Sequence, residues 1–205
     1  NNKREWVKEH LHNFDAISVR ESSAITLLHD LGHEGTQVVD PVFLLDEKQW
    51  LAMTDETAVD EDFVLIYDFL NSPDIANVAK RISRLYGCKI YSIGPWPLDY
   101  ANRNFRYSGP RTFITLASKA RCVVSNSFHG SAFSIIFRRP FFVVERGDGL
   151  NARMHDLLSH YNIPDRIVTT QTTDAQLIAD IDYDAVSDIV KDDINCSLDF
   201  LKRNL

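Results

Sequence analysis

The segment 127–131, which reads Ser-Phe-His-Gly-Ser, holds the side chains best suited to chemistry in this sequence. It directly follows the apolar run CVVSN and leads into a helical pattern of apolar residues. The first N–H groups of a helix are unpaired, and the helix dipole is positive there. Ser127, His129 and Ser131 at such a turn predict an anion pocket, and Gly130 would let a ligand approach the backbone closely.

A purely structural interpretation of the same turn stays open. Ser127 could be an ordinary helix N-cap and His129 a partly exposed helix residue, because strand-to-helix turns with serine are common. Asn151 and Arg153 follow the turn Gly147-Asp148-Gly149 and open the next predicted helix, so binding and capping are equally supported for them.

Other candidates are weaker. Arg138 and Arg139 are typical cations of a helix C-terminus. Trp96 and Tyr100 lie on a loop rich in proline and asparagine, where they could stack on a sugar, although loop aromatics more often cover the edge of a core. Four residues separate His29 from His33, but Gly32 breaks the helix between them and no third ligand is near, so we expect no metal site.

Alternating strands and amphipathic helices are expected to position these residues. Strands are predicted at about residues 63–69, 88–94, 121–127 and 140–145, and helices at about 75–86, 111–120, 129–137, 152–161 and from 184. The strands are almost continuously apolar, which is typical of a parallel sheet covered on both faces. The fold class is therefore α/β: a Rossmann-like, three-layer α/β/α domain with a mainly parallel sheet. Ligands of such sheets bind at the carboxyl ends of the strands.

The first part of the chain is predicted to be a separate segment. Residues 15–20 and 37–45 are expected to be strands, with a helix at 21–31 between them; Pro41 implies an edge, a bulge or a crossing between sheets. We divide the chain into a β-α-β segment (1–45) from the end of a missing N-terminal domain, an acidic connector (46–62) and a C-terminal Rossmann-like domain (63–205).

Composition excludes several classes of protein. Of 205 residues, 44% are hydrophobic and 25% charged, which is typical of a globular chain, and no apolar run is long enough to span a membrane. A formal charge of −7 argues against a nucleic-acid coat. Three cysteines without a CxxC pair predict reduced thiols in a cytoplasmic protein. The chain shows no signal-peptide pattern, and its start without Met predicts a piece of a longer protein.

The segment SNSFHGSAFSIIFRRPF resembles the signature of the polysaccharide pyruvyl transferase family. The segments FDAISVRES, VVDPVFLL, GPRTFITLASKARCVV and LNARMHDLLSHYNIPDR agree with that family in order and spacing, so the resemblance spans about residues 14–166. It implies the C-terminal half of a two-domain, GT-B-like bacterial enzyme. Such an enzyme transfers a pyruvyl group from phosphoenolpyruvate to two sugar hydroxyls as a ketal, in the synthesis of exopolysaccharide or cell-surface polysaccharide.

The resemblance also implies roles for individual residues. His129 would bind phosphate or act as the general acid, and Arg20 would hold an anionic group of the donor. The remaining substrate-binding candidates are Ser127, Gly130, Ser131, Asn151 and Arg153. Many relatives carry an arginine where Ser127 stands, and a neutral hydrogen bond is roughly half as strong as a charge-assisted one. Arg138, Arg139 or Arg153 could supply the lost charge.

Two other functions remain open at this point: a GT-B glycosyltransferase that uses a nucleotide sugar, and a non-catalytic ligand-binding or assembly domain. For a pyruvyl transferase we expect no cofactor besides the co-substrate phosphoenolpyruvate. The acceptor would be a sugar or a lipid-linked oligosaccharide, and the full-length protein could associate peripherally with a membrane. We expect the chain alone to be inactive, because a cleft between two domains loses half its walls when one is missing.

Overall fold

The computed structural model describes residues 2–59, 62–147 and 151–205. The chain divides into two compact units, one of Asn1–Leu44 with Ser187–Leu205 and one of Leu45–Val186. Nothing in the sequence indicated that the end of the chain groups with its beginning.

The second unit is built on a parallel sheet of six strands in the order β5-β4-β3-β6-β7-β8. The strands are β3 (Phe63–Tyr67), β4 (Lys89–Ile93), β5 (Arg103–Phe105), β6 (Cys122–Ser125), β7 (Phe141–Val144) and β8 (Ile167–Val168). The predicted α/β class with a parallel sheet is confirmed. Strands β5 and β8 were not predicted, since three and two residues are too few to show a period.

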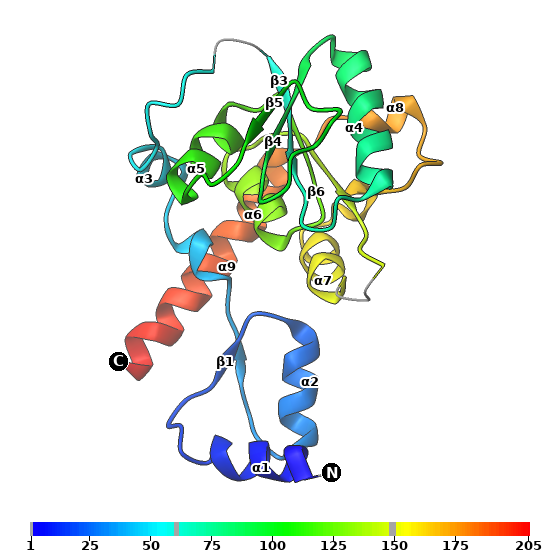
Figure 1. Cartoon of the computed structure of the whole chain (residues 1–205). Coiled ribbons are helices and arrows are strands. Elements are labelled where there is room, and N and C mark those ends of the chain that lie inside the picture. Colours follow the sequence, from blue (N-terminus) through cyan, green and yellow to red (C-terminus); the bar gives the residue numbers. More distant parts are fainter. Residues whose placement is uncertain (1, 60–61, 148–150) are drawn as a thin grey trace. The chain divides into compact units, whose positions relative to one another are not determined.

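Helices lie on both faces of this sheet (Figure 1). They are α3 (Glu47–Leu51), α4 (Pro73–Tyr86), α5 (Pro110–Lys119), α6 (Phe128–Ile136), α7 (Ala152–His160), the 3₁₀ turn η2 (Pro164–Arg166) and α8 (Asp174–Leu177). Helix α4 has Ser72 as its N-cap and Pro73 in its first turn, and it ends at Gly87, whose φ of +64° is a left-handed conformation that glycine adopts without strain.

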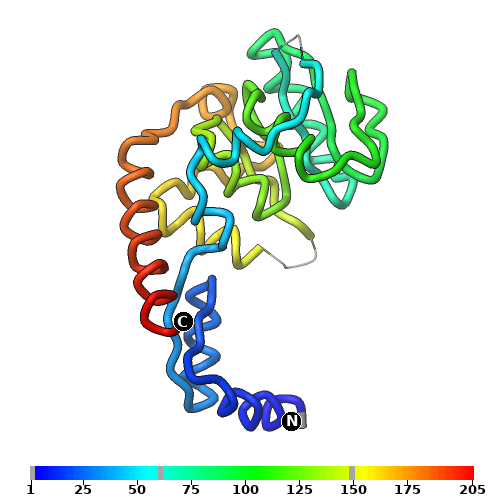
Figure 2. Tube along the Cα trace, turned by 90° about the vertical axis from the view of Figure 1, so that its left-hand side faces the viewer, coloured from blue at the N-terminus to red at the C-terminus, as the bar shows by residue number. Residues whose placement is uncertain are grey.

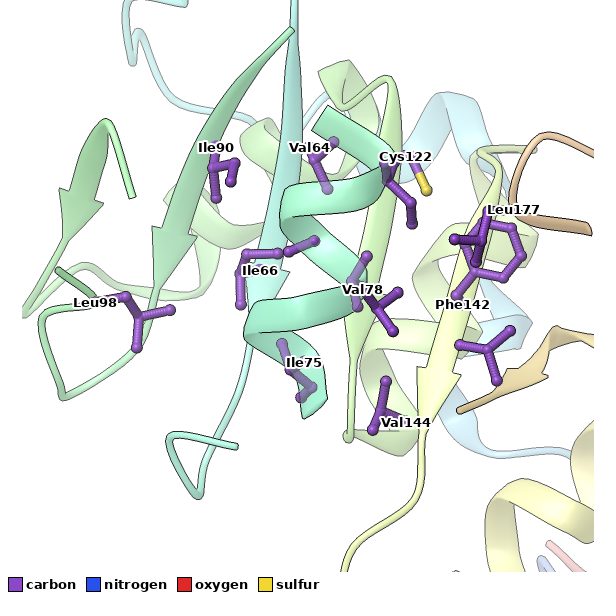
Figure 3. Packing of buried hydrophobic residues seen from close by; sticks show 14 residues of the cluster. Val64, Ile66, Ile75, Val78, Ile90, Leu98, Cys122, Phe142, Val144 and Leu177 are labelled. Atoms are coloured by element: carbon purple, nitrogen blue, oxygen red, sulfur yellow. The ribbon is translucent and has the colours of Figure 1, made fainter. Parts of the chain in front are cut away.

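Successive side chains of β3 point to opposite faces of the sheet, as in any pleated strand. Val64 and Ile66 pack in a buried cluster with α4, whereas the ring of Tyr67 contacts that of Phe113 in α5. Figure 3 shows the cluster: residues of β3, β4, β6 and β7 meet α4, and Leu177 of α8 closes it on the same face. Helices α4 and α8 therefore cover one face of the sheet, and α5 and α6 cover the other.

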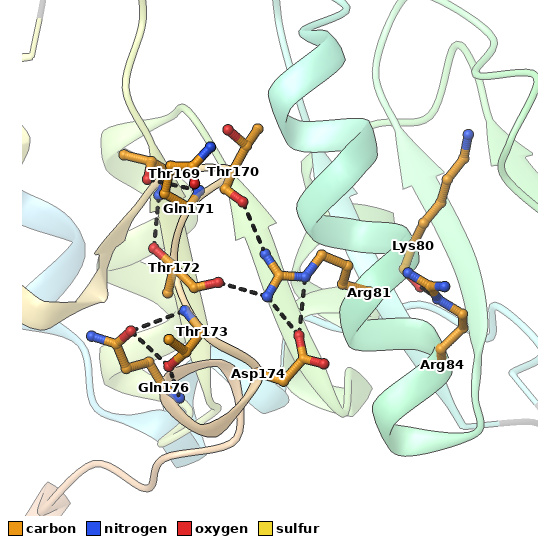
Figure 4. Close-up of polar contacts among 10 residues, drawn as sticks. All are labelled: Lys80, Arg81, Arg84, Thr169, Thr170, Gln171, Thr172, Thr173, Asp174 and Gln176. Carbon is orange, nitrogen blue, oxygen red and sulfur yellow. Dashed lines mark hydrogen bonds and ion pairs between the residues drawn. The ribbon is translucent and has the colours of Figure 1, made fainter.

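Arg81 of α4 holds the segment that leads into α8 (Figure 4). Its guanidinium donates to the carbonyl oxygens of Thr170 (3.3 Å) and Thr172 (2.6 Å) and to Oδ1 of Asp174, 3.0 Å from Nε. Asp174 is the first residue of α8, and Thr173 before it forms a capping box with Gln176. One planar fork thus fixes α8 against α4, which keeps Leu177 buried.

Asp55 joins the connector before β3 to helix α5. Its carboxylate accepts hydrogen bonds from the hydroxyls of Thr112 (2.6 Å) and Thr57 (2.5 Å), and Asp55 N–H donates to Thr115 Oγ1 (2.9 Å). Hydrogen bonds from Thr112 and Thr57 hold the pKa of Asp55 far below its usual value.

We expect Asp55→Asn to destabilise the protein at neutral pH and to matter less in acid. Because the folded pKa is lowered, the carboxylate stabilises the fold fully above its unfolded value of 3.8 and loses that effect as the pH falls below it. Urea unfolding of both proteins at pH 6 and pH 3 tests this. A difference in unfolding free energy that does not shrink at pH 3 would contradict it.

The first unit contains a small parallel β-α-β arrangement. Its elements are α1 (Asn2–Leu11), β1 (Ser18–Val19), α2 (Ser22–Asp30), β2 (Thr36–Gln37) and the 3₁₀ helix η1 (Pro41–Leu44), with the later part of α9 (Tyr183–Asn204). Figure 2 shows α9 as one continuous helix, orange to red. That residues 1–45 come from the end of another domain stays a prediction.

The predicted strand at 37–45 is wrong beyond its first residue. Strand β2 ends at Gln37, and Pro41–Leu44 form the 3₁₀ helix η1. Pro41 has no N–H for a ladder, while Asp40 accepts from the backbone N–H groups of Val42, through its side chain, and Phe43, through its carbonyl. These local bonds satisfy the backbone that a strand would have left unpaired.

Two features bear on the compartment. None of the helices in the described ranges combines the length and the apolar character that a membrane span needs. Cys88, Cys122 and Cys196 carry free thiols, and burial raises the pKa of Cys88 and Cys122. A cytoplasmic location stays a prediction.

Candidate functional site

The strand order changes direction between β3 and β6, which makes this the switch point of the sheet. From β3 the chain moves outward to β4 and β5, and then returns to β6 on the other side of β3. Ligands of open parallel sheets bind at this switch point, outside the carboxyl ends of the strands. Asn126 and Ser127 follow β6 there, and Asp68 follows β3.

The turn from β6 into α6 is tied to β3 by Ser125. Its hydroxyl donates to the carbonyl oxygen of Tyr67 (2.6 Å) and accepts from the N–H of Ser127 (3.0 Å). A Cβ on Gly130 would lie 2.5 Å from Ser125 Oγ and 2.8 Å from Ser125 Cβ. Because Gly130 has no Cβ, α6 can lie close to Ser125 at the end of β6.

We expect Gly130→Ala to destabilise the second unit by roughly 1–2 kcal/mol, since overpacking outweighs the better helix propensity of alanine. Adding Ser125→Gly removes both clashing atoms, so the cost of Gly130→Ala should fall in that background. Gly109→Ala is the matched control, because a Cβ there meets nothing within 4 Å. Urea unfolding measures all of them. Equal costs at Gly130 and Gly109 would refute this account.

A hydrogen bond between Asp68 and Asn126 joins the ends of β3 and β6 at the switch point. Asn126 Nδ2 donates to Asp68 Oδ1 (2.6 Å), and Asn126 Oδ1 accepts from the N–H of Phe69 (3.3 Å). The buried Asp68 carboxylate also accepts from the N–H groups of Leu70 (2.8 Å) and Ser72 (2.6 Å). Sequence reasoning missed this pair, because both residues fall near the ends of the predicted strands 63–69 and 121–127, whereas β3 and β6 end just before them.

His129 lines a cavity of about 620 Å³ at the carboxyl ends of β3, β4 and β5. We call it the aromatic cavity, because its walls carry Tyr67, Phe69, Phe105, Tyr107, Phe113 and Phe133 beside His129. His129 is the second residue of α6 and is half-buried. Burial raises the pKa of Tyr67, so its phenol stays protonated and able to donate. His129 thus borders a cavity that is large enough for a small molecule.

Arg153 lies beside the same turn. Its guanidinium carbon is 4.2 Å from the ring centroid of Phe128, the residue that precedes His129. Helix α7 also carries His155, whose Nε2 is 2.6 Å from Oε1 of Glu145 just after β7. The structure thus brings the predicted Arg153 against Phe128, which precedes the predicted His129 in α6, and His129 lines the aromatic cavity.

The other predicted residues of the second unit serve the local fold in this structure. The side chain of Asn151 exchanges two hydrogen bonds with the backbone of Arg146, both of 2.8 Å. Residues 148–150 lie outside the described residues. Ser127 and Ser131 are buried, and the described residues offer no hydrogen-bond partner to Ser131 Oγ. Substrate binding by Ser127, Gly130, Ser131 and Asn151 stays a prediction.

Arg20 belongs to the first unit, where it follows β1. Its Nη1 forms an ion pair with Oδ2 of Asp40, a carboxylate that is only 3% exposed. Arg20 itself is 43% exposed. Its charge therefore already neutralises a buried carboxylate, and its predicted contact with the donor is untested.

Two of the weaker candidates, Arg138 and Tyr100, have structural contacts. Arg138 forms an ion pair with Asp184, and Tyr100 packs against the core with Lys80 over its ring. Trp96 is exposed, and neither Trp96 nor Tyr100 is among the residues that line the aromatic cavity. Within the described ranges, no group of three or more metal-ligating side chains comes together.

The family model of polysaccharide pyruvyl transferase matches residues 1–148 of the 205-residue chain. The chain belongs to the polysaccharide pyruvyl transferase family. The resemblance inferred from the SNSFHG segment is thereby confirmed. No curated protein sequence matches the chain.

Two solved structures resemble this member of the pyruvyl transferase family. UDP-GlcNAc 2-epimerase from Neisseria meningitidis, in a crystal structure with UDP-GlcNAc bound, is similar over 90% of this chain, with a TM-score of 0.54 and 11% identity. AviGT4, a glycosyltransferase involved in avilamycin A biosynthesis, is similar over 91%, with a TM-score of 0.49 and 13% identity. The chain spans 61% of the length of each. The similarity to the epimerase confirms the predicted GT-B-like fold.

Proposed function

We propose that the second unit binds phosphoenolpyruvate at the N-terminus of α6 and that His129 is the general acid of pyruvyl transfer to a sugar. The observation that carries the proposal is the position of His129 in the first turn of α6, at the switch point of the sheet and open to a cavity. The family to which the chain belongs supports the same reaction.

The charges beside His129 suit the donor. Phosphoenolpyruvate carries a phosphate and a carboxylate, and the amino end of a helix attracts anions. Arg153, stacked on Phe128, places a guanidinium next to this helix end, and guanidinium groups bind both kinds of anion through two parallel hydrogen bonds. In this proposal Arg153 supplies the positive charge that Ser127 does not.

The reaction needs one proton donor and two acceptor hydroxyls. His129 gives a proton to C3 of phosphoenolpyruvate, which turns the methylene into a methyl group and leaves positive charge at C2. The first hydroxyl adds to C2 and returns its proton to His129. The C2–O bond to phosphate then breaks, the second hydroxyl closes the ketal at C2, and its proton leaves with the phosphate. Atoms and charges balance, and no redox cofactor takes part.

Calorimetric titration of the chain tests the proposal, with phosphoenolpyruvate and UDP-N-acetylglucosamine as the two ligands. We expect phosphoenolpyruvate to bind, and Arg153→Gln to weaken it by about tenfold or more, as the loss of a charged hydrogen bond implies. Arg84→Gln on the exposed side of α4 is the matched control, since it changes the net charge equally. Preference for UDP-N-acetylglucosamine would favour a glycosyltransferase. Binding of neither ligand would favour a non-catalytic domain.

The finer assignments go with this proposal. The acceptor would be a sugar or a lipid-linked oligosaccharide, and the product a pyruvylated exopolysaccharide or cell-surface polysaccharide. Peripheral membrane association, a cytoplasmic location and the inactivity of the chain alone remain predictions.

A further inference from the structure

The aromatic cavity has a composition that suits one of the two substrates and not the other. Its volume of about 620 Å³ is within the range of small-molecule sites. Its described lining residues include no Lys, Arg, Asp or Glu. From these walls we infer that the aromatic cavity binds a pyranose ring of the acceptor, stacked by its C–H face on the aromatic side chains. This inference rests on the proposed function, because it assigns the second substrate to the same site.

The described lining favours a neutral ligand over the donor. Phosphoenolpyruvate carries two anionic groups, and placing them among aromatic rings costs hydration free energy unless cations pair with them. Arg103 and Arg106 stack on the wall rings of Phe105 and Tyr107, but neither is among the described residues that line the cavity. Arg153 of α7 stacks on Phe128, the residue that precedes His129, and is not among the described residues that line the cavity. His129 therefore has an anion-binding side at Arg153 and an apolar side at the aromatic cavity. A neutral sugar fits the apolar side, since its C–H face is apolar and its hydroxyls lie around the rim.

Tyr107 gives an independent reason to expect a flat ligand. This residue is 89% exposed, so its ring gains almost nothing from the core. Its φ is +56°, a left-handed backbone conformation that tyrosine rarely adopts. Arg106 nevertheless holds the ring, with its guanidinium carbon 4.9 Å from the centroid and Nη2 2.8 Å from the hydroxyl. The Tyr107 ring, held by this contact at the edge of the cavity, can therefore stack on a flat ligand.

The arrangement explains how hydroxyl groups reach the reacting carbon. Phe69 after β3 and Tyr107 after β5 are both exposed wall residues, whereas His129 belongs to the same cavity from α6. A sugar ring bound in this cavity shares its space with His129. Two neighbouring hydroxyls on the rim of that sugar ring are what ketal formation at C2 requires.

Binding of simple glycosides to the 205-residue chain tests the inference by amide NMR spectra. The probes are methyl β-D-galactopyranoside and the methyl glycoside of N-acetylglucosamine, with geraniol and uridine as an apolar chain and a planar base. We expect at least one glycoside to shift the amide signals of Tyr107, Gly109 and His129. Shifts produced by geraniol or uridine alone would overturn the inference.

Two variants examine the stacking directly. Tyr107→Asn keeps a residue that tolerates positive φ, and Phe69→Ala removes the second exposed ring. Each should weaken glycoside binding about fivefold, as the loss of one aromatic contact implies, while phosphoenolpyruvate binding stays unchanged. Leu85→Ala, an exposed apolar residue of α4, is the control. Their amide spectra report folding.

The outcomes separate the two proposals. Phosphoenolpyruvate binding without any effect of Tyr107→Asn and Phe69→Ala on glycosides overturns the acceptor site and leaves the proposed function intact. Glycoside binding that depends on both rings, without phosphoenolpyruvate binding, overturns the proposed function instead.

Discussion

Replacing His129 by alanine is expected to lower pyruvyl transfer by about 100- to 10,000-fold, the usual contribution of a general acid. The melting temperature should stay nearly unchanged, because His129 is half-buried at the wall of a cavity and fills no core position. Release of phosphate from phosphoenolpyruvate, measured with an acceptor glycoside in an active form of the protein, gives the rate. Thermal unfolding followed by circular dichroism gives the stability.

His160→Ala is the matched control for that experiment. His160 is an exposed imidazole at the end of α7, so its loss should change neither rate nor melting temperature. A melting temperature that falls by many degrees in His129→Ala would assign His129 to packing. Transfer at an unchanged rate would remove it from the mechanism altogether.

The strands could be predicted where burial on both faces makes their sequence continuously apolar. Strands β3, β4, β6 and β7 were predicted because both faces of a central parallel strand are covered. Strand β5 contains Arg103 and Asn104 at the edge of the sheet, where no such run is required. The run VVDPVFLL reads as a strand, but Pro41 and the local bonds of Asp40 turn it into a 3₁₀ helix.

The site was predictable only where its residues are neighbours in sequence. His129 could be found because strand, turn and helix follow one another within one segment. The aromatic cavity takes its walls from the ends of three strands and the starts of α5 and α6, so its members are scattered along the chain. Trp96 and Tyr100 were plausible stacking residues by type, yet Phe105 and Tyr107 occupy the cavity walls instead.

Asp68 and Asn126 were also hard to predict as a pair, because they are far apart in the sequence. They are 58 positions apart, and each is an ordinary loop residue until β3 and β6 pair. Both side chains are buried, and Asp68 satisfies three donors: the amide of Asn126 and the N–H groups of Leu70 and Ser72. A buried carboxylate is tolerated there because hydrogen bonds replace its water.

Asp68→Ala is therefore expected to destabilise the protein by about 3 kcal/mol, because it leaves several buried donors without an acceptor. Asp74→Ala, an exposed acidic residue in the first turn of α4, should cost less than about 1 kcal/mol. Urea unfolding measures both variants. Equal losses of unfolding free energy would mean that the hydrogen bonds of Asp68 do not stabilise the fold as proposed. In a double-mutant cycle Asn126→Ala should cost less once Asp68 is absent, since the two share a hydrogen bond. Asn126 also holds the N–H of Phe69, so both variants should weaken glycoside binding at the aromatic cavity as well as the fold.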